Sequence, residues 1–232
     1  DSGVEFFSGV PDSLLKDICA YISDNTSSGN HIISANEGNA VSLGIGHYLA
    51  TKKVPLIYLQ NSGLGNIINP LLSLADKEVY SIPMLLLIGW RGEPGVSDEP
   101  QHIKQGRVTT NLLKAMEIPF EILSPKTSSN EADQIINRML LEATKQNTPC
   151  ALLVKKGTFK SYSLKLINPY DRALYREEAI EIIINELDEN DIIISTTGVA
   201  SRELFEYREK KSQSHERDFL TVGGMGHASQ IA

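Results

Sequence analysis

The sequence has 232 residues, of which 41% are hydrophobic, and carries a formal net charge of −7. This length and apolar content suit one or two globular domains with buried cores. With 22 basic against 29 acidic residues there is no basic surface of the kind that nucleic acid requires, so we expect no nucleic-acid partner. No uncharged apolar stretch reaches about 18 residues and no secretory signal stands at the start, so we expect a cytoplasmic protein with no membrane partner.

The two cysteines, Cys19 and Cys150, lie far apart in apolar surroundings. We interpret them as buried free thiols, which are typical of a reducing compartment.

Helical patterns and short apolar runs alternate along the first 156 residues. A first helix is predicted over 12–24, where Pro11 and Asp12 give a start signal. Strands are predicted over 31–35, 54–59, 84–88, 120–123 and 151–154, and helices over 39–51, 66–75, 103–116 and 130–145. Short apolar strands separated by helices are typical of a parallel sheet covered on both faces. We therefore predict that residues 1–156 form a doubly wound α/β domain.

Residues 157–174 break this rhythm and are predicted to be a polar interdomain linker. The alternation then resumes, with helices expected over 175–187 and 201–210 and strands over 191–195 and 219–222. Residues 175–232 contain too few strands to bury a sheet on both faces. Either they complete the first sheet, or they are the first part of a second α/β domain in a longer protein. We favour the second interpretation.

The first chemically suggestive loop is Asn36-Glu37-Gly38. Glu37 follows an apolar run and precedes a helical pattern, and ligands of open α/β sheets bind at that place. The alternative is that Asn36 and Glu37 only cap the helix and complement its dipole.

Two further loops follow predicted strands. In the segment 60–66, Gly63 and Gly65 let the backbone approach a ligand closely, although an ordinary turn is the alternative. The segment 89–102 is longer than most connections. In this segment, Arg91 is a bidentate hydrogen-bond donor suited to an oxyanion, and His102 is suited to carry a proton. The alternative is a solvated loop in which Arg91 pairs with Glu93 or Asp98.

A glycine cluster lies between the last predicted strand and a helical start, in the segment 221–229. A strand that runs through glycines into a helix is an arrangement that binds phosphate. The spacing matches neither a dinucleotide fingerprint nor a Walker loop.

Together these loops resemble those of the thiamine-diphosphate-dependent 2-oxo acid decarboxylases. The segment 36–40 resembles the glutamate-containing turn of their pyrimidine domain, and 223–226 resembles the segment whose Met bends the cofactor. The segment 62–65 resembles their glycine-rich loop, although Asn69 falls one position late. Long strings at 7–15, 60–66, 69–76, 89–95, 98–102, 195–205 and 215–220 are similar to the phosphonopyruvate decarboxylase family, with the sulfopyruvate decarboxylases as its nearest relatives.

The resemblance implies thiamine diphosphate and Mg²⁺ as cofactors, with Glu37 as a catalytic group that hydrogen-bonds the cofactor's aminopyrimidine. The other implied cofactor-binding residues are Gly63, Gly65, Thr197, Gly198, Gly224, Met225 and Gly226. The expected metal ligands lie beyond Ala232. For the substrate we expect Asn61, Arg91 and Gln101 as binding residues and His102 as a catalytic proton carrier. His47, inside a predicted helix, is expected to be structural.

The implied reaction is decarboxylation of 3-phosphonopyruvate to phosphonoacetaldehyde and CO₂ in phosphonate biosynthesis. One alternative is sulfopyruvate decarboxylation, and another is a non-catalytic regulatory or scaffold homologue. The presence of Glu37, Met225 and Gly226 argues against the non-catalytic class. The resemblance also implies a homo-oligomer with active sites between subunits.

Overall fold

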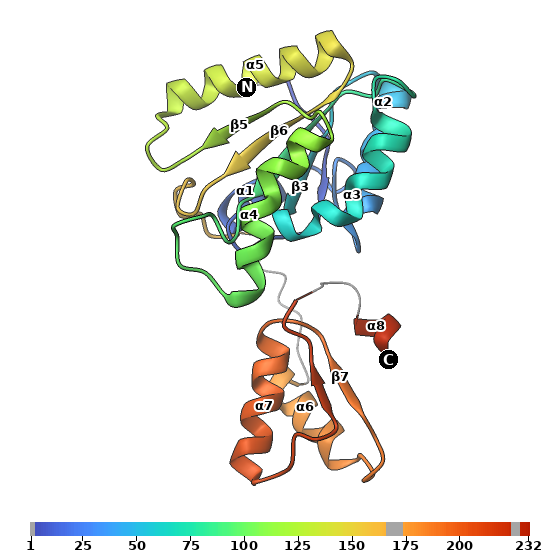
Figure 1. The fold of residues 1–232 in the computed structure, drawn as a ribbon, viewed down its shortest axis with the longest axis vertical. Coiled ribbons are helices and arrows are strands. Elements are labelled where there is room, and N and C mark those ends of the chain that lie inside the picture. The colour runs from blue at the N-terminus through green and yellow to red at the C-terminus, as the bar shows by residue number, and fades with distance from the viewer. Residues whose placement is uncertain (1–2, 166–173, 224–227) are drawn as a thin grey trace. The chain divides into compact units, whose positions relative to one another are not determined.

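The computed structural model describes residues 3–165, 174–223 and 228–232, and the chain divides into two compact units, 1–167 and 168–232 (Figure 1). The described part of unit 1 forms a six-stranded sheet and that of unit 2 a two-stranded sheet, here called the large and the small sheet. Every pair of neighbouring strands is parallel. The predicted α/β class, with a doubly wound parallel-sheet domain, is confirmed. That unit 2 is the first part of a second domain stays a prediction.

The large sheet has the strand order β2-β1-β3-β4-β6-β5. Its strands are β1 (Phe7–Gly9), β2 (His31–Ile33), β3 (Leu56–Gln60), β4 (Met84–Gly89), β5 (Phe120–Leu123) and β6 (Pro149–Val154). The helices of unit 1 are α1 (Lys16–Asn25), α2 (Glu37–Thr51), α3 (Leu64–Pro70), α4 (Pro100–Ala115) and α5 (Ser129–Gln146), with a 3₁₀ turn at Asn61–Gly63 and a π-helical turn at Leu71–Ala75.

Helices cover both faces of the large sheet, as the apolar strand runs require. One core joins alternate strand residues such as Ile57 and Leu86 to α2, α3 and α4. The other joins the intervening residues, such as Tyr58 and Leu85, to α1 and α5. Because successive strand side chains point to opposite faces, each central strand contributes to both cores.

The chain changes direction across the sheet at β1. From β1 it moves to β2 on one side, and β3 then pairs with β1 on the other side. Such a reversal opens a crevice at the carboxyl ends of the two strands, and ligands of open α/β sheets bind there.

Strand β1 was not predicted, because it has only three residues and two of them are Ser8 and Gly9. It is nevertheless paired on both sides. At Gly9 a Cβ atom would lie 2.5 Å from Cδ2 of Tyr58, so the packing of that buried ring requires glycine. Ser8 satisfies its buried hydroxyl by donating to the carbonyl of Ile32 (2.9 Å).

Two helix predictions were wrong in detail. The helix expected from residue 12 begins at Lys16, and Asp12 lies before it in the loop that follows β1. The helix expected over 66–75 is α3 followed by the π-helical turn. Pro70 stands at that junction and has no N–H with which to continue the ladder of hydrogen bonds.

In unit 2 the described elements are α6 (Arg176–Asn185), β7 (Ile193–Ser195), α7 (Val199–Lys211), β8 (Asp218–Leu220) and α8 (Ala228–Ile231). Residues 157–165, the start of the predicted linker, belong to unit 1. There the Tyr162 amide donates to Asp17 (2.9 Å) and its hydroxyl to Asp24 (3.0 Å).

The long loop between β4 and α4 is tightly folded. Trp90 donates from Nε1 to the carbonyl of Gly106 in α4 (2.9 Å). Gly92 has a φ of 66°, and a Cβ atom at Gly106 would lie 2.6 Å from the Arg91 carbonyl oxygen. The loop and the helix thus approach each other more closely than a side chain at either glycine permits.

Two ion pairs hold the same loop. Glu93 pairs with Lys155, which follows β6. Arg91 binds Asp98 through Nη2 and through Nε (2.8 Å to Oδ2), which is one of the pairings considered as an alternative in the sequence analysis. The Gly92 amide also donates to Asp98 (2.7 Å). Hydrogen bonds from Arg91 hold the pKa of the Asp98 carboxyl well below its usual range.

Both cysteines are free, and Cys150 is buried. Burial raises the pKa of each thiol to about 12. In the part of the chain that the structure describes, no helix is long and apolar enough to cross a bilayer.

The close approach at Gly106 predicts a large effect of a small substitution. We expect Gly106→Ala to lower the free energy of unfolding by about 2 kcal/mol, because the added methyl group overpacks the contact with the loop. Gly46→Ala is the matched control, since Gly46 also lies in a helix but has open space around its Cβ position. That change should raise stability by about 0.5 kcal/mol through helix propensity. Urea unfolding of the full-length protein measures both, and equal effects would contradict the packing argument.

The Arg91–Asp98 pair predicts a pH-dependent contribution to stability. At pH 7 we expect Asp98→Asn to cost about 2 kcal/mol, because it removes a charge-assisted pair. A carboxyl whose pKa is depressed in the folded state stabilises above its unfolded pKa of about 4 and loses this contribution as the pH falls. The difference between wild type and variant should therefore shrink below pH 4 in urea unfolding experiments. The control Glu121→Gln breaks an exposed pair with Arg138 and should cost less than about 0.5 kcal/mol.

Candidate active site

The predicted site residues of unit 1 lie at the carboxyl edge of the large sheet, where all its strands end (Figure 1). Glu37 follows β2, Asn61 and Gly63 follow β3, and Arg91 follows β4. Because the sheet is parallel, residues far apart in the sequence meet at this edge.

Glu37 is the first residue of α2 and is only 3% exposed. Its Oε2 atom accepts a hydrogen bond from Nδ2 of Asn66 in α3 (2.7 Å). Among the described residues, the structure gives Oε1 no hydrogen bond. Oε1 is also not one of the fully buried side-chain atoms that lack a partner there, so this oxygen is open to a donor from outside the fold. The unpaired oxygen therefore marks a place where a donor from a ligand would be stabilised.

Capping of α2 does not require this carboxylate. Asn36 is the N-cap residue, and its side chain accepts the hydrogen bond from the Gly38 amide (2.8 Å). Asn36 thus fulfils the capping role considered for it, whereas the Glu37 carboxylate is directed to Asn66 and Gly63.

Gly63 contacts the Glu37 side chain so closely that a Cβ atom at this position would lie 2.5 Å from Cδ of Glu37. Any larger residue would displace the carboxylate. Gly65 has open space around its Cβ position and is exposed. The structure therefore gives a physical reason for glycine at position 63 and none at position 65.

Asn66 is a site residue that the sequence analysis missed. Attention fell on Asn69 instead, which is exposed and accepts a hydrogen bond from Ser73 (3.0 Å). Asn66 lies in the first turn of α3, and this turn carries its amide to Glu37. A polar residue directly after the second glycine of the segment 60–66 was the available signal.

A second buried carboxylate, Asp12, lies in the loop after β1 and is 5% exposed. Its Oδ1 accepts a hydrogen bond from Gln60 Nε2 (2.7 Å), and Oδ2 accepts one from the Leu14 amide (3.1 Å). Ser62 in turn donates to Oε1 of Gln60 (2.6 Å). Burial raises the pKa of the Asp12 carboxyl. These contacts connect the loop after β1 to the loop that contains Gly63.

Asn61 is 1% exposed and holds the main chain of Arg91. Its Oδ1 accepts from the Arg91 amide (3.0 Å), and its Nδ2 donates to the Arg91 carbonyl (2.8 Å) and to Thr109 (2.9 Å). Arg91 also donates from Nη1 to Ser13 (2.9 Å) in the loop after β1. The structure thus brings Asn61 and Arg91 together, with Asn61 positioning the arginine.

Gln101 and His102 lie in the first turn of α4, and both are half-buried. The Nδ1 atom of His102 is buried and has no hydrogen-bond partner among the described residues. Burial lowers the pKa of His102, and the neighbouring positive charge of Arg91 lowers it further. The imidazole is therefore neutral at neutral pH and offers one donor and one acceptor.

His47 lies in α2 and stacks on Phe6, with ring centroids 4.4 Å apart. Its side chain also contacts Thr51 (3.2 Å). These contacts agree with the structural role expected for it.

In unit 2, Thr197 and Gly198 connect β7 to α7. Gly198 has a φ of 89° and is the N-cap residue of α7, so a side chain there would be strained. The helix therefore begins next to the carboxyl end of the strand, a place that suits an anion. Gly224, Met225 and Gly226 lie outside the described residues.

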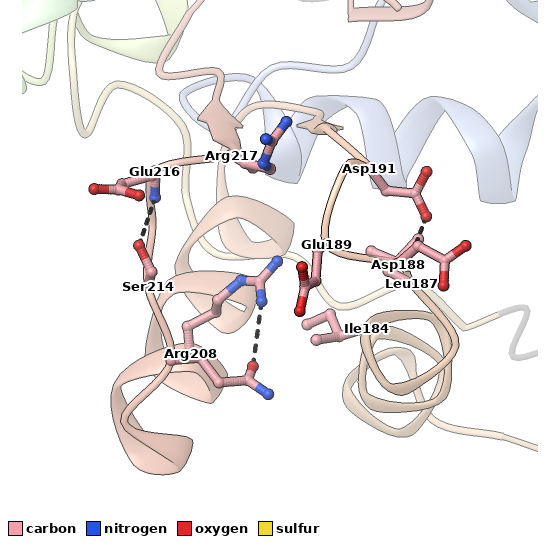
Figure 2. A pocket seen from close by; sticks show the side chains of 10 residues that line it. Ile184, Leu187, Asp188, Glu189, Asp191, Arg208, Ser214, Glu216 and Arg217 are labelled. Atoms are coloured by element: carbon pink, nitrogen blue, oxygen red, sulfur yellow. Dashed lines mark hydrogen bonds between the residues drawn. The ribbon is translucent and has the colours of Figure 1, made fainter.

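A pocket of about 390 Å³ lies at the opposite edge of the small sheet, lined by the segments that precede β7 and β8 (Figure 2). Asp191 in this pocket accepts from the Asp188 amide (2.8 Å), and Arg217 donates to the Asn190 carbonyl (3.2 Å). Arg208 pairs with Asp218 (2.9 Å). Asp191, Arg208 and Arg217 of this pocket are thus engaged with protein partners.

Within 3–165, 174–223 and 228–232, no three His, Cys, Asp or Glu side chains are grouped so that they would hold a metal ion. The Mg²⁺ ligands expected beyond Ala232 stay a prediction.

The family described as thiamine pyrophosphate enzyme, N-terminal TPP binding domain, matches residues 1–114. In fold, the chain is similar to the crystal structure of benzoylformate decarboxylase from Polynucleobacter necessarius, with a TM-score of 0.51 and 18% identity, over 78% of this chain and 34% of that one.

Two curated relatives are more similar in sequence. Over 99% of its length the chain is 30% identical to phosphonopyruvate decarboxylase of Streptomyces hygroscopicus, and it spans 58% of that relative. Over 66% of its length it is 37% identical to sulfopyruvate decarboxylase subunit alpha of Methanococcus maripaludis, and it spans 87% of that subunit. The chain therefore belongs to the thiamine pyrophosphate enzymes, within the group that contains the phosphonopyruvate and sulfopyruvate decarboxylases.

Proposed function

We propose that the full-length protein is a thiamine-diphosphate-dependent decarboxylase that converts 3-phosphonopyruvate to phosphonoacetaldehyde and CO₂. The observation that carries this proposal is the Glu37 carboxylate, buried beside Gly63 and anchored to Asn66 through one oxygen. Within the described residues its other oxygen has no donor.

The residues around Glu37 fit the aminopyrimidine half of thiamine diphosphate. A heterocycle that presents an N–H group supplies the donor that Oε1 lacks. Gly63 adds no side chain on that side of the carboxylate. Asn66 fixes the orientation of the carboxylate, so the acceptor is held in place before a ligand binds.

Thiamine diphosphate, when bound, supplies the electron sink that a 2-oxo acid needs in order to lose CO₂. The role that we assign to Glu37 is to hold a proton at a ring nitrogen of the aminopyrimidine. Burial makes this hydrogen bond stronger than it would be in water. Glu37 thereby acts as a catalytic residue through the cofactor's own proton-transfer groups.

We assign the substrate to the neighbouring loops. Arg91, positioned by Asn61, offers charged donors to an anionic substrate. Gln101 adds a neutral polar group. His102, neutral at neutral pH and with an unpaired Nδ1 among the described residues, is the proposed proton carrier.

The remainder of the proposal concerns the second unit and the assembly. Thr197, Gly198 and the segment 224–226 are assigned to the diphosphate, and Mg²⁺ is assigned to ligands beyond Ala232. A cytoplasmic homo-oligomer with active sites between subunits completes the proposal. Helix α7 begins directly after Gly198, so the free N–H groups of its first turn lie next to the residues that we assign to the diphosphate.

Sulfopyruvate decarboxylation is the second candidate function, favoured by the 37% identity to a sulfopyruvate decarboxylase subunit. Phosphonopyruvate takes precedence because, over 99% of the chain, the identity to a phosphonopyruvate decarboxylase is 30%, against 25% to a sulfopyruvate decarboxylase that matches over the same share. Steady-state rates of the full-length protein, supplied with thiamine diphosphate and Mg²⁺, decide between them. We expect the larger kcat/KM for phosphonopyruvate. A larger value for sulfopyruvate would establish the second candidate, and turnover of neither would favour the non-catalytic class.

The assembly is tested by analytical ultracentrifugation of the full-length protein together with its specific activity. We expect a dimer or larger oligomer, because an active site between subunits needs two copies. A monomer with undiminished activity would rule this assembly out.

The sharpest prediction concerns Glu37→Gln. The amide is nearly isosteric, so we expect an unchanged fold and nearly unchanged thiamine diphosphate binding. Turnover should nevertheless fall on the order of 10²-fold or more, as it does when a positioned proton-transfer group is removed. The rate at which the cofactor's C2 proton exchanges, measured by NMR, should fall together with turnover.

The matched control is Glu117→Gln, which changes an exposed glutamate away from this site. If Glu37 were only a cap, its substitution would cost about 1 kcal/mol of stability with little kinetic effect. Normal C2-proton exchange with a lowered melting temperature would therefore overturn the catalytic assignment.

A further inference from the structure

A second cavity opens at the carboxyl edge of the large sheet, on the side of β4 and β6. It measures about 390 Å³ and is formed by the loops after β1, β4 and β6. We call it the basic pocket, because three of its lining residues are Lys16, Arg91 and Lys156.

The acidic residues of the basic pocket are already engaged. Asp98 is held by Arg91 and by the Gly92 amide (2.7 Å). Asp17 accepts a hydrogen bond from the Tyr162 amide (2.9 Å). Lys16 and Lys156 are exposed, and the structure gives neither an ion pair among the described residues. Two lysine charges therefore face the cavity without a counter-ion, in a chain whose net charge is −7.

Arg91 keeps donors available although Asp98 binds it. A guanidinium group has five N–H bonds. Its Nε–H and one N–H of Nη2 are directed to Asp98, and one N–H of Nη1 is directed to Ser13 (2.9 Å). Two N–H bonds remain for a ligand, and Asp98 fixes the plane in which they lie.

The basic pocket is connected to the Glu37 site through protein hydrogen bonds. Ser62, next to Gly63, donates to Gln60, and Gln60 donates to Asp12. Asp12 accepts from the amide of Leu14, which lines the pocket. The amino-terminal end of α1 also lines the pocket, and its dipole favours an anion. A ligand group in the pocket thus lies next to the loop that carries Asp12.

We propose that the basic pocket binds the tetrahedral oxyanion at the far end of the substrate, with Lys16 and Lys156 as the residues that select a charged 2-oxo acid over an uncharged one. This inference rests on the proposed function and adds the recognition of the substrate's second anion. The two ammonium groups match the charge of a phosphonate dianion, and the guanidinium, whose charge Asp98 offsets, adds directed donors. Nearby anions such as Asp98 would repel such a group if the lysines were absent.

The test uses the full-length protein and methylphosphonate, which carries the tail without the 2-oxo acid. Isothermal titration calorimetry measures its affinity in wild type, Lys16→Gln, Lys156→Gln and the control Lys145→Gln. Lys145 is an exposed lysine of α5 outside the pocket. We expect each pocket variant to raise Kd about tenfold, as loss of one charge-assisted hydrogen bond does, and the control to leave it unchanged.

A kinetic arm separates substrate recognition from binding of a free anion. Methylphosphonate should compete with phosphonopyruvate, and the KM for phosphonopyruvate should rise about tenfold in each pocket variant with kcat nearly unchanged. 2-Oxobutanoate, which lacks the charged tail, should inhibit all variants with the same Ki. Inhibition by methylphosphonate that is not competitive would identify a separate effector site and overturn the assignment to the substrate.

The outcomes distinguish this inference from the proposed function. If the wild type decarboxylates phosphonopyruvate but the lysine substitutions leave Kd and KM unchanged, the basic pocket is not the oxyanion site and the proposed function stands. If the wild type decarboxylates no 2-oxo acid, the proposed function fails, and the assignment of the pocket to a substrate tail fails with it.

Discussion

The parallel arrangement of the large sheet determines where chemistry is possible in unit 1. Both faces of the sheet are covered by helices and filled with apolar side chains, so polar groups gather at the strand ends. Parallel strands bring all their carboxyl ends to one edge. The reversal of the chain between β1 and β3 then leaves a crevice at this edge, and Asp12, Glu37 and Gly63 are positioned around it.

Burial of two carboxylates in this crevice imposes a second constraint. Each must exchange water for protein donors, and the two do so differently. Asp12 has donors at both oxygens, from Gln60 and from Leu14. Glu37 has Asn66 at one oxygen only among the described residues. Asp12 thus serves to join two loops, whereas Glu37 keeps one oxygen open, and for this reason we assign the ligand to Glu37.

Much of this arrangement could be predicted from the sequence, because it depends on local patterns. The apolar runs located five strands of the large sheet, and the loops after them contained the candidate residues. Strand β1 was missed because its pairing comes from neighbours far away in the sequence rather than from its own three residues. Asp12 was taken for a helix start for a related reason. Its partner Gln60 is 48 residues away, and no local pattern indicates that contact.

Side-chain pairing was also harder to predict than position. The sequence placed Arg91 in a long loop and allowed either an oxyanion or an acidic neighbour as its partner. Only the folded loop, with Gly92 against α4, shows that Asp98 reaches the guanidinium. Asn66 and Asn69 are three positions apart in the sequence. Because α3 begins at Leu64, Asn66 is the one directed to Glu37.

The fixed pairing of Arg91 has a consequence for how this edge of the sheet would bind the anion that we propose. Asp98 offsets most of the charge of Arg91 but leaves its geometry intact, so the arginine contributes directed donors more than net charge. Net positive charge in the same cavity comes from Lys16 and Lys156, which are exposed and adaptable. In this arrangement the Arg91 guanidinium, paired with Asp98, would orient an anion, whereas Lys16 and Lys156 would attract it. That division would suit a protein whose net charge of −7 repels the anionic substrate that we propose.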